Sequence, residues 1–222
     1  MISFLNNYFN YNHFFISGIL TVYLIYLYFN IKNLDKMISI IKVLLIFNFV
    51  TFYGYLLYFG DFNYRVHLPL HLCYITEFFL FLSLIFKTKI LYPWIVLNGL
   101  GGGITGFTNS NLPPDSLLIE NIHLHLSHFN LLLFTLIAFK MKLVITTSSF
   151  LKSILLNLFI FSFVVWFNIE FGSNYWFTMS RPPGTNLALL FSDWPYYLYG
   201  LIIIGIISYY LTFKLFSRNI SK

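Results

Sequence analysis

The residue types that can do covalent chemistry are concentrated on two stretches of this sequence. The first carries the single cysteine, Cys73, and a carboxyl group four residues later, Glu77. Five of the six histidines lie on the same two stretches: His67, His71, His123, His125 and His128. A thiolate is a strong nucleophile, and a neighbouring imidazole can accept the thiol proton. This combination predicts nucleophilic catalysis by Cys73, provided that the fold brings the two stretches together.

The amino-acid composition indicates the class of protein in which these two stretches must come together. The chain has 222 residues, of which 59% are hydrophobic and only 9% are charged, whereas a soluble domain carries about 25% charged residues. So few charges cannot cover a water-facing surface, and the chain therefore needs lipid. The net charge of +6 does not indicate a nucleic-acid partner, because no basic run exceeds two residues. One cysteine excludes an internal disulfide and cysteine-rich metal sites.

Apolar runs predict an all-α polytopic membrane protein with seven transmembrane helices in one domain, 1–222. A bilayer core of about 30 Å takes roughly 20 helical residues to cross. The predicted spans are 14–30, 37–59, 68–86, 90–107, 119–139, 148–170 and 195–213. The last two are joined by a long connector, 172–194, which contains Pro182 and Pro183.

The distribution of charge gives these spans a direction. Eleven of the thirteen basic residues belong to one set of alternate segments, with Lys42 and Lys152 just inside the adjoining span ends, and only Arg65 and Arg181 belong to the other set. By the positive-inside rule the first set is cytoplasmic. The sequence therefore predicts a multi-pass protein of the cell membrane, with its N-terminus outside and its C-terminus in the cytoplasm.

With this direction the polar residues lie in the outer half of the membrane, where ionisable groups are candidates for function. At 100° per residue, Cys73 and Glu77 share a helix face, whereas His71 lies about 160° from Cys73. On the fifth span, Asn121, His125 and His128 form one stripe. A cavity lined by Cys73, Glu77, His125 and His128 is therefore geometrically allowed. The glycines at 99 and 101–103 would let the fourth span approach closely at the same depth.

Several strings together resemble the YwaF-type integral membrane proteins, which are related to the human transmembrane protein one-six-four acyltransferase. The matching pieces are the LPLHLC string at 68–73, the glycine-rich fourth span with its Pro-Asp loop, and His128-Phe129. Asn174-Tyr175, the RPPG string at 181–184 and Trp194-Pro195-Tyr196 also match. The resemblance covers about residues 50–200.

The resemblance implies an enzyme that moves a fatty acyl chain from one lipid to another acceptor through a cysteine nucleophile. With the predicted topology, we expect the donor to be a phospholipid of the outer leaflet, which leaves a thioester on Cys73, and the acceptor to be a lysophospholipid or a lipoprotein. The resemblance implies Cys73 as the nucleophile and His128 as the base. No cofactor or metal is expected.

Chemical reasoning from the residues extends these roles. His125 is a second candidate base, and Glu77 is a candidate to fix the tautomer of a histidine. The oxyanion of the tetrahedral intermediate would be bonded by His71 or Asn174. The apolar connector 172–194 is predicted to lie on the bilayer as a lid, with Arg181 pairing with the phosphate of the donor. The remaining predicted substrate-binding residues are Asn121, Asn174, Tyr175 and Trp194.

Three other interpretations are open at this point. The spacings His67/His71 and His125/His128 also suit a metal-dependent membrane hydrolase or oxidoreductase that uses these histidines with Glu77. A transporter would usually show inverted repeats, and no convincing internal similarity is visible. A membrane subunit without catalytic activity is the third possibility.

Overall fold

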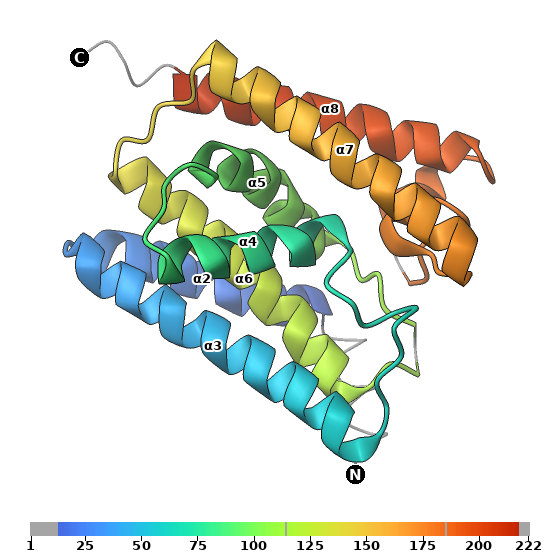
Figure 1. Cartoon of the computed structure of the whole chain (residues 1–222). Coiled ribbons are helices and arrows are strands. Elements are labelled where there is room, and N and C mark those ends of the chain that lie inside the picture. Colours follow the sequence, from blue (N-terminus) through green and yellow to red (C-terminus); the bar gives the residue numbers. More distant parts are fainter. Residues whose placement is uncertain (1–12, 114, 185, 218–222) are drawn as a thin grey trace.

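The computed structural model describes residues 13–113, 115–184 and 186–217, and all regular structure within these ranges is helical (Figure 1). The helices are α2 (His13–Asn30), α3 (Leu34–Phe59), α4 (Leu72–Ile85), α5 (Tyr92–Thr108), α6 (Leu118–Lys140), α7 (Thr147–Phe171) and α8 (Tyr196–Ser217), with the short 3₁₀ helices η1 (Tyr175–Phe177) and η2 (Leu187–Leu190). The all-α prediction is confirmed, and each α-helix begins and ends within four residues of the predicted span.

Local sequence signals explain several of these boundaries. Helix α3 begins after Asn33, whose side chain accepts a hydrogen bond from the Lys36 amide, and ends at Gly60 in the left-handed conformation. Helix α7 uses the same two devices, with Thr146 at its start and Gly172 at its end. In both helices an N-cap residue marks the start and a glycine marks the end, and both signals can be read from the sequence.

Five helices in the described part of the chain are long and apolar enough to cross a membrane: α2, α3, α6, α7 and α8. Helix α4 has 14 residues and α5 has 17, which at 1.5 Å per residue makes each shorter than the bilayer core of about 30 Å. That the chain is a multi-pass membrane protein therefore follows, whereas seven full spans and their sidedness stay predictions.

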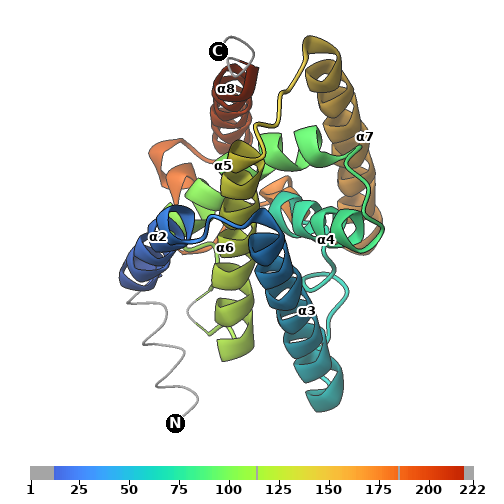
Figure 2. The same cartoon turned by 90° about the vertical axis from the view of Figure 1, so that its left-hand side faces the viewer.

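Helix α6 lies at the centre of the bundle. Most of its side chains are buried, while those of α2, α3, α7 and α8 are mostly exposed to the surroundings. In Figure 1, α7 and α8 lie on one side, α2 and α3 lie on the other, and α4, α5 and α6 fill the space between them. Figure 2, turned by 90°, shows α6 in the middle with α2 and α3 beside it. The two stretches that carry the candidate chemistry are thus on inner helices.

The ends of the helices that are rich in lysine gather together. The Lys140 ammonium at the end of α6 donates to the Ile31 carbonyl oxygen between α2 and α3, at 2.6 Å, and lies over the Tyr28 ring. The Ile145 amide, before α7, donates to the Phe216 carbonyl oxygen near the end of α8. This grouping agrees with the alternation of charge in the sequence.

An asparagine pair fastens α7 to the inner helices. The Asn157 amide donates to Asn98 Oδ1 at 3.0 Å, and Asn157 Oδ1 accepts from the Trp94 indole at 2.7 Å. Lipid supplies no hydrophobic driving force between helices, so such polar contacts and close packing hold a membrane bundle together.

Replacement of Asn157 by Leu is expected to lower the free energy of unfolding by about 1–2 kcal/mol, because the Trp94 indole and the Asn98 amide lose their shared partner. Thermal unfolding of the purified protein in detergent measures the effect. The matched control is Leu155→Ala on the same helix, since Leu155 is 66% exposed. Equal melting temperatures for Asn157→Leu and the control would show that this pair does not hold α7.

Candidate functional site

The candidate site is built on the glycines of α5, where α4 and α6 approach its backbone closely. A Cβ atom on Gly102 would lie 2.9 Å from Cys73 Sγ of α4, and one on Gly106 would overlap the His128 ring of α6. Gly103 packs in the same way against α6, where its Cβ would lie 3.3 Å from the His128 carbonyl oxygen. These close approaches require glycine, because any larger residue would push the neighbouring helix away.

This packing places the predicted nucleophile and base on the same face of α5. Gly102 and Gly106 are four residues apart and share that face, so the Cys73 thiol and the His128 ring contact α5 at positions one helical turn apart. Tyr74, which follows Cys73, places its ring 6.3 Å from the ring of His128, centre to centre. Cys73 remains partly accessible, whereas His128 is buried.

Backbone carbonyls fix the tautomers of the histidines on α6. His128 Nδ1 lies 2.6 Å from the Leu124 carbonyl oxygen, and His125 Nδ1 lies 2.8 Å from that of Asn121. A carbonyl only accepts, so each Nδ1 carries the hydrogen. The neutral His128 ring therefore has Nε2 as its proton acceptor.

His125 points toward another helix, since its ring lies 4.8 Å from that of His13 on α2. The Asn121 side chain, which was predicted to bind substrate, is held by protein groups. Its amide donates to Ser116 Oγ and to the Leu117 carbonyl. What Asn121 contributes to His125 is its backbone carbonyl.

The position of His71 differs from the sequence expectation. The predicted span begins at 68, but α4 begins at Leu72, and His71 is its extended N-cap residue, with φ −62° and ψ 143°. Proline disfavours helix in the residue before it, and Pro69 stands in this approach segment. The angular separation of about 160° between His71 and Cys73 therefore does not hold. The His71 ring lies 5.1 Å from that of Tyr175 and 5.0 Å from that of Phe177, beneath the connector.

Glu77 also differs from the expectation, because its carboxylate bonds to amides. Its Oε1 accepts from the Asn130 amide at 2.8 Å and from the Asn48 amide at 3.0 Å. The Asn48 amide also contacts Ser127, and Asn48 Oδ1 accepts from His123 Nδ1 at 3.0 Å. This buried cluster joins α3, α4 and α6. Glu77 is therefore linked to His123 through Asn48, and Ser127, which also contacts Asn48, lies 3.5 Å from His123 Nδ1 through its Oγ.

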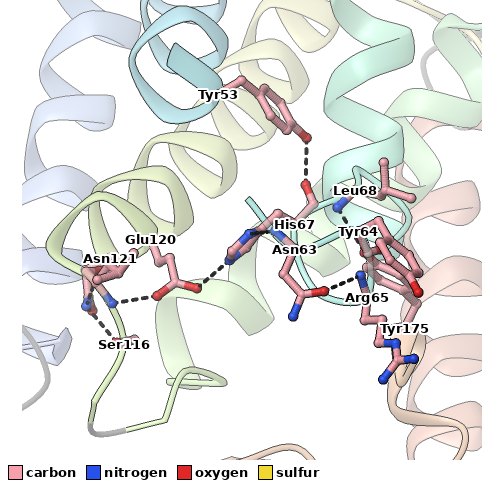
Figure 3. A network of polar contacts seen from close by, with 11 residues as sticks. Tyr53, Asn63, Tyr64, Arg65, His67, Leu68, Ser116, Glu120, Asn121 and Tyr175 are labelled. Carbon is pink, nitrogen blue, oxygen red and sulfur yellow. Dashed lines mark hydrogen bonds and ion pairs between the residues drawn. The ribbon is translucent and has the colours of Figure 1, made fainter. Parts of the chain in front are cut away.

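A separate polar network closes the end of the bundle where the connector lies (Figure 3). His67 Nε2 lies 3.2 Å from Glu120 Oε1, and the same carboxylate accepts from the Leu117 amide at the start of α6. The Tyr53 hydroxyl donates to the His67 carbonyl oxygen at 3.0 Å. Segment 60–71 is thus tied to α3 and α6. This network holds the approach to His71 in place.

Tyr175 attaches the connector to that network. Its hydroxyl donates to the Tyr64 carbonyl oxygen at 2.8 Å and accepts from the Leu68 amide at 2.9 Å (Figure 3). Burial raises the pKa of this phenol, so it stays protonated and keeps donating at neutral pH. The Asn168 side chain bonds both the Tyr175 amide and its carbonyl oxygen. These bonds make Tyr175 an anchor for the connector.

The other connector residues that were expected to bind substrate are also held by protein groups. Asn174 uses its whole amide within the loop, donating to Ser180 and accepting from the Met179 and Ser180 amides, so it offers no donor to an oxyanion. Arg181 donates to the Phe191 carbonyl oxygen at 2.8 Å and pairs with the exposed Asp193 at 3.2 Å. The Trp194 indole donates to the Thr178 carbonyl oxygen, although Trp194 is 61% exposed.

The metal-dependent interpretation gains no geometric support. In residues 13–113, 115–184 and 186–217, no group of three or more His, Cys, Asp or Glu side chains is placed to hold a metal ion. The histidines that the spacing suggested as pairs are directed to different partners: His67 to Glu120, His71 to the connector, and His125 to His13.

A family model described as the TMEM164 family matches residues 8–213, and the chain therefore belongs to this family. The match covers nearly the whole chain and confirms the resemblance that the motifs indicated. No curated protein and no solved structure matches the chain.

Replacement of Gly106 by Ala is expected to destabilise the protein by about 1–3 kcal/mol, because the added methyl group overlaps the His128 ring in a close-packed interface. Thermal unfolding in detergent tests this. Gly205→Ala on α8 is the matched control, since a Cβ there meets nothing within 4 Å. If the two alanine variants melt at the same temperature as the unmodified protein, the close approach of α5 and α6 is wrong.

Proposed function

We propose that this member of the TMEM164 family is a membrane-embedded acyltransferase that works through a thioester on Cys73. The observation that carries the proposal is the packing of the Cys73 thiol and the His128 ring one turn apart on the same glycine face of α5. The family match supports a membrane protein. The chemistry of the pair supplies the rest of the argument.

His128 is suited to act as the base. Its Nδ1 hydrogen is committed to the Leu124 carbonyl oxygen, which leaves Nε2 to accept a proton. When Nε2 takes the proton from the Cys73 thiol, the thiolate becomes the nucleophile. His125 has the same tautomer, but it packs against His13 on the side of α2. We therefore favour His128 over His125.

The substrates follow from where the thiol lies. Cys73 is a partly accessible residue of a membrane protein, so the donor that we propose is an ester-linked acyl chain of a phospholipid. The acceptor is a lysophospholipid or the amine of a lipoprotein, either of which can enter the membrane surface laterally.

The connector is the proposed contact for the lipid headgroup. The exposed Asp193 pairs with Arg181, and the phosphate of a donor would replace this carboxylate with a stronger, bidentate partner. Around this pair the connector exposes large apolar side chains, including Leu190 at 74% and Trp194 at 61%. Such a surface suits a segment that rests on the bilayer.

Replacement of Cys73 by Ala is expected to reduce acyl transfer by about 10³-fold or more, because the nucleophile is removed. The assay uses purified protein and a phosphatidylcholine that carries one labelled acyl chain. In the unmodified protein, intact mass should show an acyl adduct that hydroxylamine removes and that Cys73→Ala lacks. The matched control is Ser162→Ala on α7, whose hydroxyl bonds only within its own helix. Undiminished transfer by Cys73→Ala would overturn the assignment.

A further inference from the structure

The connector fixes the tautomer of His71, and this tautomer is the opposite of the one that His128 adopts. The Trp176 backbone amide donates to His71 Nδ1 at 3.3 Å. Since an amide N–H only donates, His71 Nδ1 must carry the lone pair, and the hydrogen of the neutral ring sits on Nε2. His71 therefore presents an N–H donor, whereas His128 presents an acceptor.

The loop that makes this contact adopts an unusual backbone conformation. Trp176 and Phe177 have φ of 58° and 54°, a region that L-residues with large side chains rarely occupy. Such residues cost about 1–3 kcal/mol each and persist only when the surroundings hold them. Here the Trp176 indole donates to the Leu70 carbonyl oxygen at 2.7 Å, and the Tyr197 hydroxyl donates to that of Phe177 at 2.7 Å. The bend turns the Trp176 amide toward His71.

The two histidines are also near one another. His71 immediately precedes α4, two residues before Cys73, and the Tyr74 ring lies 6.0 Å from the His71 ring and 6.3 Å from the His128 ring. The aromatic rings of Tyr175 and Phe177 flank His71 and restrict its rotation. A donor held in a fixed orientation beside a nucleophile and a base is the element that a tetrahedral intermediate requires.

We propose that His71 is the oxyanion-binding residue of the proposed acyl transfer, held in its donor tautomer by the Trp176 amide. This inference rests on the proposed function. In the first half-reaction the thiol proton moves to His128 Nε2 and Sγ bonds to the ester carbonyl carbon. The carbonyl electron pair moves to oxygen, which accepts the hydrogen bond of His71 Nε2–H. The C–O ester bond then breaks, and the departing alkoxide takes the proton from His128.

The second half-reaction uses the same groups in reverse order. The hydroxyl or amine of the acceptor attacks the thioester carbonyl carbon and passes its proton to His128. The oxyanion again accepts from His71, the C–S bond breaks, and the Cys73 sulfur regains the proton. His71 therefore neither gains nor loses a proton in either half-reaction, which separates its role from that of a base.

This separation can be measured because Cys73 is the only cysteine. Acylation by a labelled phosphatidylcholine forms an oxyanion, whereas alkylation by iodoacetamide does not. Replacement of His71 by Leu is expected to slow acylation of Cys73 by about 10²–10³-fold, the usual loss for one oxyanion donor, and to leave alkylation unchanged. Replacement by Gln should partly restore acylation, since its amide offers an N–H at a similar reach.

Each other result contradicts the inference. If both reactions slow in His71→Leu, the residue acts as a base or only supports the fold, and if neither slows, His71 has no part in the reaction. An unmodified protein that never forms the acyl adduct but is alkylated normally would refute the proposed function itself. A misfolded His71→Leu variant is recognised by its lowered melting temperature. In that case the His71→Gln variant is the test: its rate of acylation can fall, but its rate of alkylation must stay equal to that of the unmodified protein.

Discussion

The structure depends on the absence of side chains along one face of α5. Gly102, Gly103 and Gly106 allow α4 and α6 to pack against its backbone, at distances that a methyl group would not permit. In lipid, where apolar surface gains nothing from leaving the solvent, such close van der Waals contact is a main source of helix association. Here it has a second result, which is that a thiol from one helix and an imidazole from another face the same glycine surface.

Buried polar contacts then hold this arrangement in one register. Unpaired polar groups are costly in hydrocarbon, so the Glu77 carboxylate with the Asn48 and Asn130 amides allows little sliding among α3, α4 and α6. Glu77, the member of this cluster on α4, lies one helical turn after Cys73. At the other end the His67–Glu120 pair fixes the segment that leads to α4. Cys73 thus lies between two groups of polar contacts, the Glu77 cluster and the His67–Glu120 pair. These contacts stabilise the helix packing, so the proposed catalytic residues do not have to.

The sequence predicts the helical architecture well, because each apolar run carries its own length and cap signals. Asn33, Gly60, Thr146 and Gly172 mark ends that can be read locally. The 3.6-residue period predicted a shared face for Cys73 and Glu77 and another for His125 and His128, but it did not predict which helices these side chains contact: His125 packs against α2 and His128 against α5. The family resemblance, carried by strings such as LPLHLC, is confirmed.

Contacts between distant segments could not be predicted in this way. One partner of Glu77 is Asn48, 29 residues earlier on another helix, and no periodicity encodes that pairing. The orientation of His71 depends on where α4 starts and on a connector about 100 residues later. Asn174 looks like a free donor in the sequence, yet its own loop consumes its amide. These are properties of tertiary packing, which local patterns do not specify.

The central claim is that His128 activates the Cys73 thiol. Its most direct test is the rate at which a small membrane-permeant alkylating reagent modifies the single cysteine in folded protein, compared with a His128→Ala variant of matched thermal stability. We predict that the variant reacts slower by about tenfold or more, because the base that generates the thiolate is gone. Equal rates in the two proteins would contradict the account.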